Sequence, residues 1–241
     1  MAPHISIREF IRMPSTSAAE EPTSTLVLTS SANRFVDIRV LKNGREPVSD
    51  VAKDAAILPL SHLDWAFAGT SSSQITHHVQ DGSPLFKSTW KHWIDSRTTE
   101  AENVVDEGFM FPGSDKEETG RTLEKGTMMN SQTGKMEDYE EMWRDVSEEG
   151  EKGEGEEKKE KEKMRGMVIR LGQFCQGLMR IGEEITLERW EWTAKENWKR
   201  SFRMGDFFLP CGVAMEFDRL QLGGKITHGG LTWDVVELEE N

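Results

Sequence analysis

Short runs of branched and aromatic residues, interrupted by turn residues, recur along this chain and restrict it to a sheet fold. Clear runs are Leu26 to Thr29 and Phe35 to Leu41, which Ser-Ser-Ala-Asn separates, and Met167 to Leu171 and Phe174 to Ile181, which Gly172-Gln173 separates. Apolar side chains at every second position are typical of strands with one buried face. No long helical pattern occurs. The sequence therefore predicts antiparallel sheet, with a hairpin at each of these places.

Two further segments carry the aromatic residues. LDWAFAGT places Trp65 and Phe67 two positions apart, so they share one face of a strand. STWKHWID fits a strand with Trp90, His92 and Ile94 on one face, or a short helix that carries Trp90 and Trp93 together. ITLERWEW alternates apolar residues with charged ones.

Composition divides the chain into four parts. Residues 1–24 end in a Pro-, Ser-, Thr- and Glu-rich stretch and are predicted to be a flexible N-terminal segment. Residues 25–147 form a first β-barrel-like domain with long loops. Residues 148–164 are almost wholly Glu, Lys and Gly and indicate a charged linker. Residues 165–241 form a second β-barrel-like domain.

The two halves show the same order of sequence features, which are a hairpin, an aromatic strand and a final strand that contains a tryptophan. This order indicates a degenerate internal duplication. TLVLTSSANRFVDIRVL corresponds to GMVIRLGQFCQGLMRIG, Trp65-Ala66-Phe67 to Trp190-Glu191-Trp192, and WRDV to the terminal WDVV. Closure into a barrel removes the exposed edges of an antiparallel sheet. The fold class expected is mainly β, with two similar antiparallel, lipocalin-like barrels.

The charge balance and the cysteines bear on compartment and partners. A formal net charge of −13 makes nucleic acid and anionic membrane surfaces poor partners. Cys175 and Cys211 lie in apolar surroundings, which predicts two buried thiols in a reducing compartment. The N-terminal apolar stretch is broken by Arg8, Glu9 and Arg12, and no segment is apolar for long enough to span a bilayer. We expect a cytosolic protein with access to the nucleus.

No catalytic or metal-binding constellation emerges from the polar residues. His77-His78 would point to opposite faces of a strand and is interpreted as a solvated pair, and His92 as a half-buried histidine. The carboxylates of Glu137-Asp138 and Glu140-Glu141 are interpreted as a solvated face. We expect no cofactor, no metal and no enzymatic activity.

Eight tryptophans against one tyrosine are unusual. Trp65, Phe67, Trp190 and Trp192 are candidates either for core filling or for the lining of a cavity that holds one apolar ligand. Exposed aromatic residues could instead anchor a partner protein.

LDWAFAGT, DYEEMWRD, RGMVIRLGQFCQGLMR and GGLTWDVVEL together resemble the fungal HRI family, whose members are named for interacting with a yeast casein kinase I homologue. The similarity runs from about Thr25 to the C terminus, and Trp65 to Thr70 and Leu231 to Glu237 are its most specific pieces. The Glu/Lys linker and the long polar loop of the first half depart from it. The resemblance implies paired β-barrels, no established catalytic activity and a cytoplasmic and nuclear location. It also implies a casein kinase I-type partner and, as a further option, secretory translocon components.

Two functions follow as hypotheses. The first is a non-catalytic interaction protein that binds a casein kinase I-type kinase through its acidic segments. Ser114 and Ser147, each followed by acidic residues, are candidate phosphosites for such a kinase. The alternative is a small β-barrel protein that binds an apolar ligand.

Overall fold

Strands make up most of the part of the chain that the computed structural model describes, which is residues 2–14, 18–42, 57–78, 84–112, 120–130, 133–146 and 164–238. Within these ranges the helical elements are one single-turn helix, α1 (Cys211–Ala214), and three 3-10 turns, Leu60–His62, Ala101–Asn103 and Phe217–Arg219. None of these helices has the length and apolar character needed to cross a membrane.

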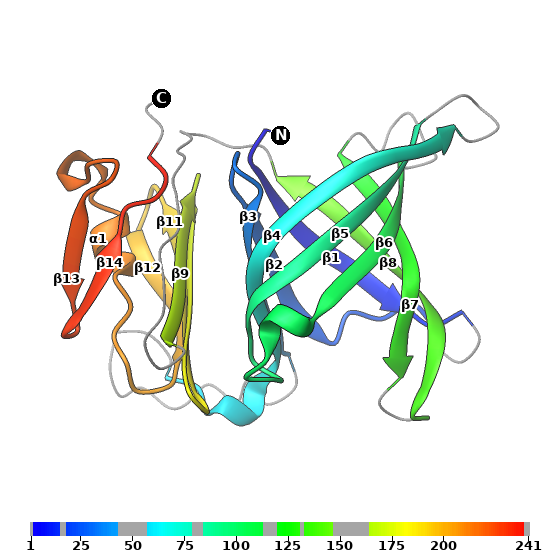
Figure 1. The fold of residues 1–241 in the computed structure, drawn as a ribbon, viewed down its shortest axis with the longest axis horizontal. Helices are drawn as coiled ribbons and strands as arrows, with labels where there is room; N and C mark the ends of the chain where they lie inside the picture. The colour runs from blue at the N-terminus through cyan, green and yellow to red at the C-terminus, as the bar shows by residue number, and fades with distance from the viewer. Residues whose placement is uncertain are drawn as a thin grey trace.

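Eight antiparallel strands close into a barrel, in which each strand pairs with the next and β8 returns to pair with β1 (Figure 1). The strands are β1 (His4–Arg12), β2 (Thr23–Thr29), β3 (Arg34–Leu41), β4 (Leu63–His78), β5 (Pro84–Asp95), β6 (Val105–Pro112), β7 (Arg121–Asn130) and β8 (Lys135–Val146). The predicted hairpin of Leu26 to Leu41 is confirmed as β2 and β3. The segment STWKHWID is strand, as part of β5, and not a short helix.

The N-terminal residues close this barrel. The prediction of a flexible segment over residues 1–24 is wrong for His4–Arg12, because β1 pairs with β2 on one side and with β8 on the other. Ile5, which is fully buried, and Ile7 alternate with polar residues, as a half-buried strand requires. The compositional signal of a loose segment came from the residues that follow β1.

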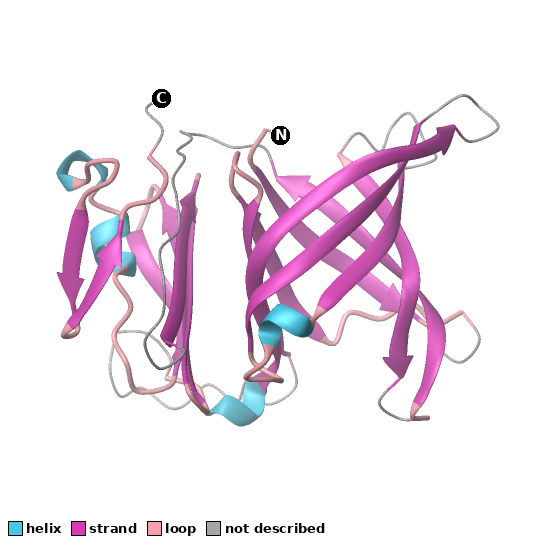
Figure 2. Ribbon diagram, in the orientation of Figure 1, coloured by secondary structure: helices cyan, strands magenta, loops and turns pink. Residues whose placement is uncertain are grey.

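The second part of the chain forms a four-stranded antiparallel sheet of β9 (Met164–Leu171), β10 (Phe174–Ile181), β11 (Glu184–Thr193) and β12 (Asn197–Met204). A short hairpin of β13 (Lys225–His228) and β14 (Leu231–Asp234) follows. Figures 1 and 2 show the sheet between the barrel and this hairpin. A Cβ atom on Gly166 would lie 2.4 Å from the ring of Trp233, so glycine permits the hairpin to pack closely on β9.

The expected second barrel is therefore wrong. The described strands of the second part form an open sheet, ordered β12-β11-β10-β9, and one face of it is covered by the first barrel instead of by its own closure. The hairpin predicted over Met167 to Ile181 is confirmed as β9 and β10. Internal duplication stays a prediction.

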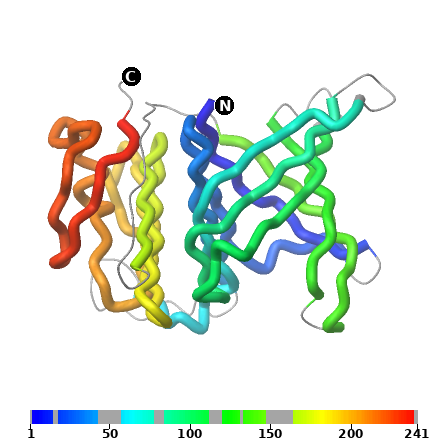
Figure 3. The backbone as a smooth tube through the Cα atoms, viewed as in Figure 1, coloured from blue at the N-terminus to red at the C-terminus, as the bar shows by residue number. Residues whose placement is uncertain are grey.

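The main apolar core lies outside the barrel, between its wall and the four-stranded sheet. Figure 3 shows these two layers of backbone side by side. On β3, Val36, Ile38 and Val40 face the sheet, and each is at most 1% exposed. The sheet contributes buried side chains from all four of its strands, namely Ile169, Leu171, Phe174, Leu178, Ile185, Leu187, Phe202 and Met204. The apolar face of each layer thus covers that of the other.

Two buried polar side chains of the sheet bind backbone oxygens of the barrel. Gln176 Nε2 donates to the carbonyls of Leu26 and Val36 at 3.1 and 3.0 Å. Arg189 Nη2 donates to the carbonyl of Ile38 at 2.8 Å, and Arg189 Nε donates to Gln176 Oε1 at 2.7 Å. Because polar groups buried in a core are costly unless they are hydrogen-bonded, these contacts fix the position of the sheet on the barrel.

We expect Leu178→Ala to lower the free energy of unfolding by about 2–5 kcal/mol, because Leu178 is fully buried in the shared core. Urea unfolding followed by far-UV circular dichroism and by tryptophan fluorescence should give coincident transitions, since the barrel and the sheet share that core. Leu222→Ala, at a side chain that is 54% exposed, is the matched control and should change stability by less than about 0.5 kcal/mol. Separate transitions for the two probes would contradict a shared core.

Candidate functional site

The inner face of the barrel is unusually polar. Successive side chains of a strand point to opposite faces, so the apolar residues of β3 that face the sheet leave Asp37 and Arg39 facing inward. On β8, Tyr139, Glu141 and Trp143 face inward in the same way. The interior therefore carries the charged groups that an ordinary barrel places outside.

A cavity of about 890 Å³ occupies the barrel interior. Its volume lies within the range of ligand pockets, roughly 300–1,000 Å³. Apolar and aromatic residues share its wall with carboxylates, hydroxyl groups and two arginines. An eight-stranded barrel can be filled by its side chains or can hold one small ligand, and this one leaves the space for a ligand.

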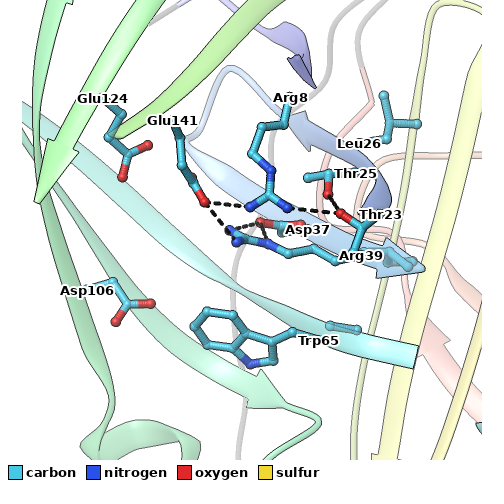
Figure 4. Close-up of polar contacts among 12 residues, drawn as sticks. Arg8, Thr23, Thr25, Leu26, Asp37, Arg39, Trp65, Asp106, Glu124 and Glu141 are labelled. Carbon is cyan, nitrogen blue, oxygen red and sulfur yellow. Dashed lines mark hydrogen bonds and ion pairs between the residues drawn. The ribbon is translucent and has the colours of Figure 1, made fainter. Parts of the chain in front are cut away.

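A network of ion pairs occupies one wall of the cavity (Figure 4). Arg39 Nη2 lies 2.8 Å from Asp37 Oδ2, and Arg39 Nη1 lies 3.3 Å from Glu141 Oε1. Arg8 Nη1 donates to the same Glu141 oxygen at 2.5 Å, and Arg8 Nε donates to Glu21 at 2.8 Å. Two guanidinium groups thus face three carboxyl groups, so both arginine charges are already matched within the network.

Aromatic rings lie next to this network. The rings of Trp65 and Phe67 have centroids 4.2 Å apart, and Arg39 lies 5.2 Å and 5.4 Å from their centroids, respectively. His92 stacks on Phe67 at 4.4 Å. Asp95 accepts hydrogen bonds from Trp65 Nε1 at 2.9 Å and pairs with His92 Nδ1 at 2.8 Å.

The other ring nitrogen of His92, Nε2, lies 3.0 Å from Asp106 Oδ2. Burial opposes its protonation, but the hydrogen bonds to Asp106 and Asp95 outweigh burial and raise the pKa of His92. The two neighbouring carboxyl groups thus favour the protonated imidazole, and these contacts give His92 a structural role, since its ring stacks on Phe67.

Glu124 of β7 differs from the other buried carboxyl groups. Its side chain accepts hydrogen bonds from Tyr139 OH at 2.5 Å and from Trp143 Nε1 at 2.9 Å, and both donors are neutral. Burial and the nearby charge of Glu141 raise the pKa of Glu124 to about 8. At neutral pH this carboxyl group holds a proton.

Two glycines make room for this arrangement. A Cβ atom on Gly126 would lie 2.7 Å from the ring of Tyr139, which is its cross-strand partner, and one on Gly108 would lie 2.7 Å from Glu124 Oε1. Larger residues at either position would displace the side chains that surround the carboxyl group.

The aromatic residues singled out from the sequence separate into two places. Trp65 and Phe67 line the cavity. Trp190 packs into a smaller core beneath the β13–β14 hairpin, and Trp192 is 40% exposed. The structure does not bring the two pairs together.

The remaining residues singled out from the sequence lie away from the cavity or outside the described residues. Cys175 and Cys211 are free and fully buried, as predicted. Their mutual hydrogen bond and burial raise the pKa of Cys211 well above its ordinary value, so this thiol stays protonated. His77 is exposed in β4. Ser114, Ser147 and the linker over 148–163 lie outside the described residues.

The interpretation of Glu137, Asp138, Glu140 and Glu141 as a solvated face is wrong for Glu140 and Glu141, which are 8% and 2% exposed. The Glu141 side chain binds Arg8 and Arg39 inside the barrel. Glu140 faces away from Glu141 and pairs with Arg12 and Lys125. Within the described ranges, no group of three or more His, Cys, Asp or Glu residues is arranged to hold a metal ion.

Sequence reasoning missed Asp37, Arg39 and Glu124. The segment FVDIRVL alternates Asp37 and Arg39 with branched residues, which is a detectable sign that the opposite face of this strand carries charge. Glu124 lies in the segment RTLEKGTMM, where no regular alternation of apolar and charged residues indicates that its side chain points inward.

Comparison with known proteins gives one family and one similar structure. The family model described as Protein HRI1 matches residues 4–237. The crystal structure of the uncharacterized protein YLR301w from Saccharomyces cerevisiae superposes with a TM-score of 0.67 at 15% sequence identity, over 97% of this chain and 98% of that one. At this identity the likeness shows the fold alone. A search of curated proteins gave no match.

The raised pKa of Glu124 predicts how stability depends on pH. The folded protein binds this proton more tightly than the unfolded chain, whose glutamate has its ordinary pKa of 4.5, so the stability due to this group falls as pH rises from about 4.5 to about 8. Between about pH 5 and pH 9, wild type should lose roughly 2 kcal/mol or more relative to Glu124→Gln. Urea unfolding at a series of pH values measures this. Glu184→Gln, at an exposed position, should follow wild type. Parallel profiles for wild type and Glu124→Gln would refute a raised pKa.

Proposed function

This chain belongs to the HRI1 family, and from its barrel we propose that it binds and holds a small amphipathic molecule. The observation that carries the proposal is the cavity of about 890 Å³ inside the closed barrel. The barrel strands direct many of their apolar side chains outward, into the core between the barrel and the second sheet, so these side chains do not fill the cavity.

The lining supports a ligand with both polar and apolar parts. Trp65, Phe67, Phe86 and Met110 offer apolar surface, whereas Asp37 and Glu124 offer polar atoms. Pockets of this kind use apolar walls for affinity and a few placed polar groups for orientation.

We propose binding without catalysis. A buried carboxyl group with a raised pKa is also a feature of general acids. Here both oxygens of Glu124 accept hydrogen bonds from side chains of the wall, and Glu141 is bound by two arginines. These contacts favour a role in holding a ligand.

A neutral fluorescent probe, N-phenyl-1-naphthylamine, should bind with a stoichiometry of one and receive energy from the tryptophans of the cavity wall. Val27→Trp places a large ring in the cavity, and we expect it to weaken probe binding by about tenfold or more. Leu222→Trp adds the same ring at a side chain that is 54% exposed and serves as the control. Equal binding by both variants, with unchanged circular dichroism, would place the probe outside the barrel.

The casein kinase I-type partner remains a second proposal, supported by the family resemblance and by the acidic balance of the chain. Deletion of residues 148–163 should lower affinity for such a kinase at low salt, since charge attraction weakens as salt rises. Binding of the purified kinase is measured by biolayer interferometry at two salt concentrations. Unchanged affinity at low salt would exclude the charged linker as the contact.

A further inference from the structure

We propose that the ligand of this cavity is an organic cation, an amine with an apolar body, whose positive end lies among Glu124, Glu141 and Asp37. This inference rests on the proposed binding function and specifies its ligand class. Four features of the interior support it.

The first feature is the charge balance of the wall. Seven carboxyl groups line the cavity, and they belong to Asp37, Asp95, Asp106, Glu107, Glu124, Glu141 and Asp145. The two arginines that line it are matched, since Arg39 pairs with Asp37 and Glu141, and Arg97 lies 3.7 Å from Asp64 and 4.3 Å from the ring of Trp65. A ligand carboxylate would have to displace one of these partners. Cationic side chains also contact Glu141, Asp95, Asp106 and Glu107. Glu124, by contrast, is bound by neutral donors, so a ligand cation would meet a carboxyl group that has no cationic partner within hydrogen-bond distance among the described residues.

The second feature is a buried oxygen without a partner. Asp37 lines the cavity and is only 2% exposed, and its Oδ2 atom receives both contacts from Arg39. Its Oδ1 atom has no hydrogen-bond partner among the described residues. A buried acceptor of this kind costs stability unless a donor reaches it, and an ammonium group supplies such donors.

The third feature is the environment of Glu124. Its two hydrogen-bond donors, Tyr139 and Trp143, orient the carboxyl group without bringing positive charge. The other charged groups that act on it are Glu141 on β8 and Arg39 on β3. Figure 4 shows Glu124 and Glu141 entering from neighbouring strands, with Asp106 and Trp65 across the same space. A bound cation between these carboxyl groups would stabilise Glu124 as a carboxylate.

The fourth feature is the set of rings around these carboxyl groups. Trp65, Phe67, Tyr139 and Trp143 all line the cavity. The faces of aromatic rings attract cations, and a site out of water strengthens that attraction. The methionine and phenylalanine side chains farther along the wall, Phe86, Met110 and Met128, then contact the apolar body.

Displacement of bound N-phenyl-1-naphthylamine by three probes of equal chain length tests the ligand class. The probes are dodecylamine, dodecanol and dodecanoate, each below its micelle concentration. We expect dodecylamine to bind about ten- to a hundredfold more tightly than dodecanol, because a charge-assisted hydrogen bond is stronger than a neutral one, and dodecanoate to bind most weakly. Glu124→Gln should reduce the preference for the amine over the alcohol by about tenfold, and Glu184→Gln should leave it unchanged.

A measurement on the wild-type protein keeps the test valid if a variant fails to fold. The affinity for dodecylamine should rise from about pH 6 to about pH 9 and then level off, because Glu124 must lose its proton to bind the cation while an alkylammonium keeps its charge over this range. The affinity for dodecanol should not follow this course. Equal affinity for the amine and the alcohol, or tighter binding of dodecanoate, would overturn the inference and leave the binding function intact. Failure of N-phenyl-1-naphthylamine and of all three probes to bind would instead refute the binding function itself.

Discussion

The contact between the barrel wall and the four-stranded sheet determines the rest of this structure. Val36, Ile38 and Val40 bury their apolar face against the sheet, and the alternation of the strand then directs Asp37 and Arg39 inward. A barrel whose apolar residues faced its own axis would be filled. Here the main apolar core is the layer outside the barrel, so the interior holds aromatic and charged side chains around a cavity.

This arrangement also explains why the sheet does not close. Its inner face is covered by the barrel, and its outer face is partly covered by α1 and the β13–β14 hairpin, through Cys175, Met179, Leu209 and Trp233. A sheet covered on both faces does not need to bury its apolar residues around an axis of its own.

The hairpins and the strands of the core could be predicted from the sequence, because alternation and turn residues are local signals. The hairpins of β2 with β3 and of β9 with β10 are recovered in this way. The role of β1 could not, since its pairing with β8 joins residues more than a hundred positions apart. The same limit applies to the cavity. Trp65 and Phe67 were recognisable as candidates from the sequence. Glu141 was not, because the residues that bind it, Arg8 and Arg39, lie more than a hundred positions away in the chain.

The position of the core has a consequence for divergence within the family. In a filled barrel, each interior substitution changes the packing on which stability depends. In this barrel the main apolar core lies outside the cavity, so many residues of the lining can change without a loss of packing in that core. The Saccharomyces cerevisiae structure keeps the architecture at 15% identity, which fits a scaffold that tolerates extensive replacement. Selection for a new ligand and selection for a stable chain would then act on different faces of the same strands.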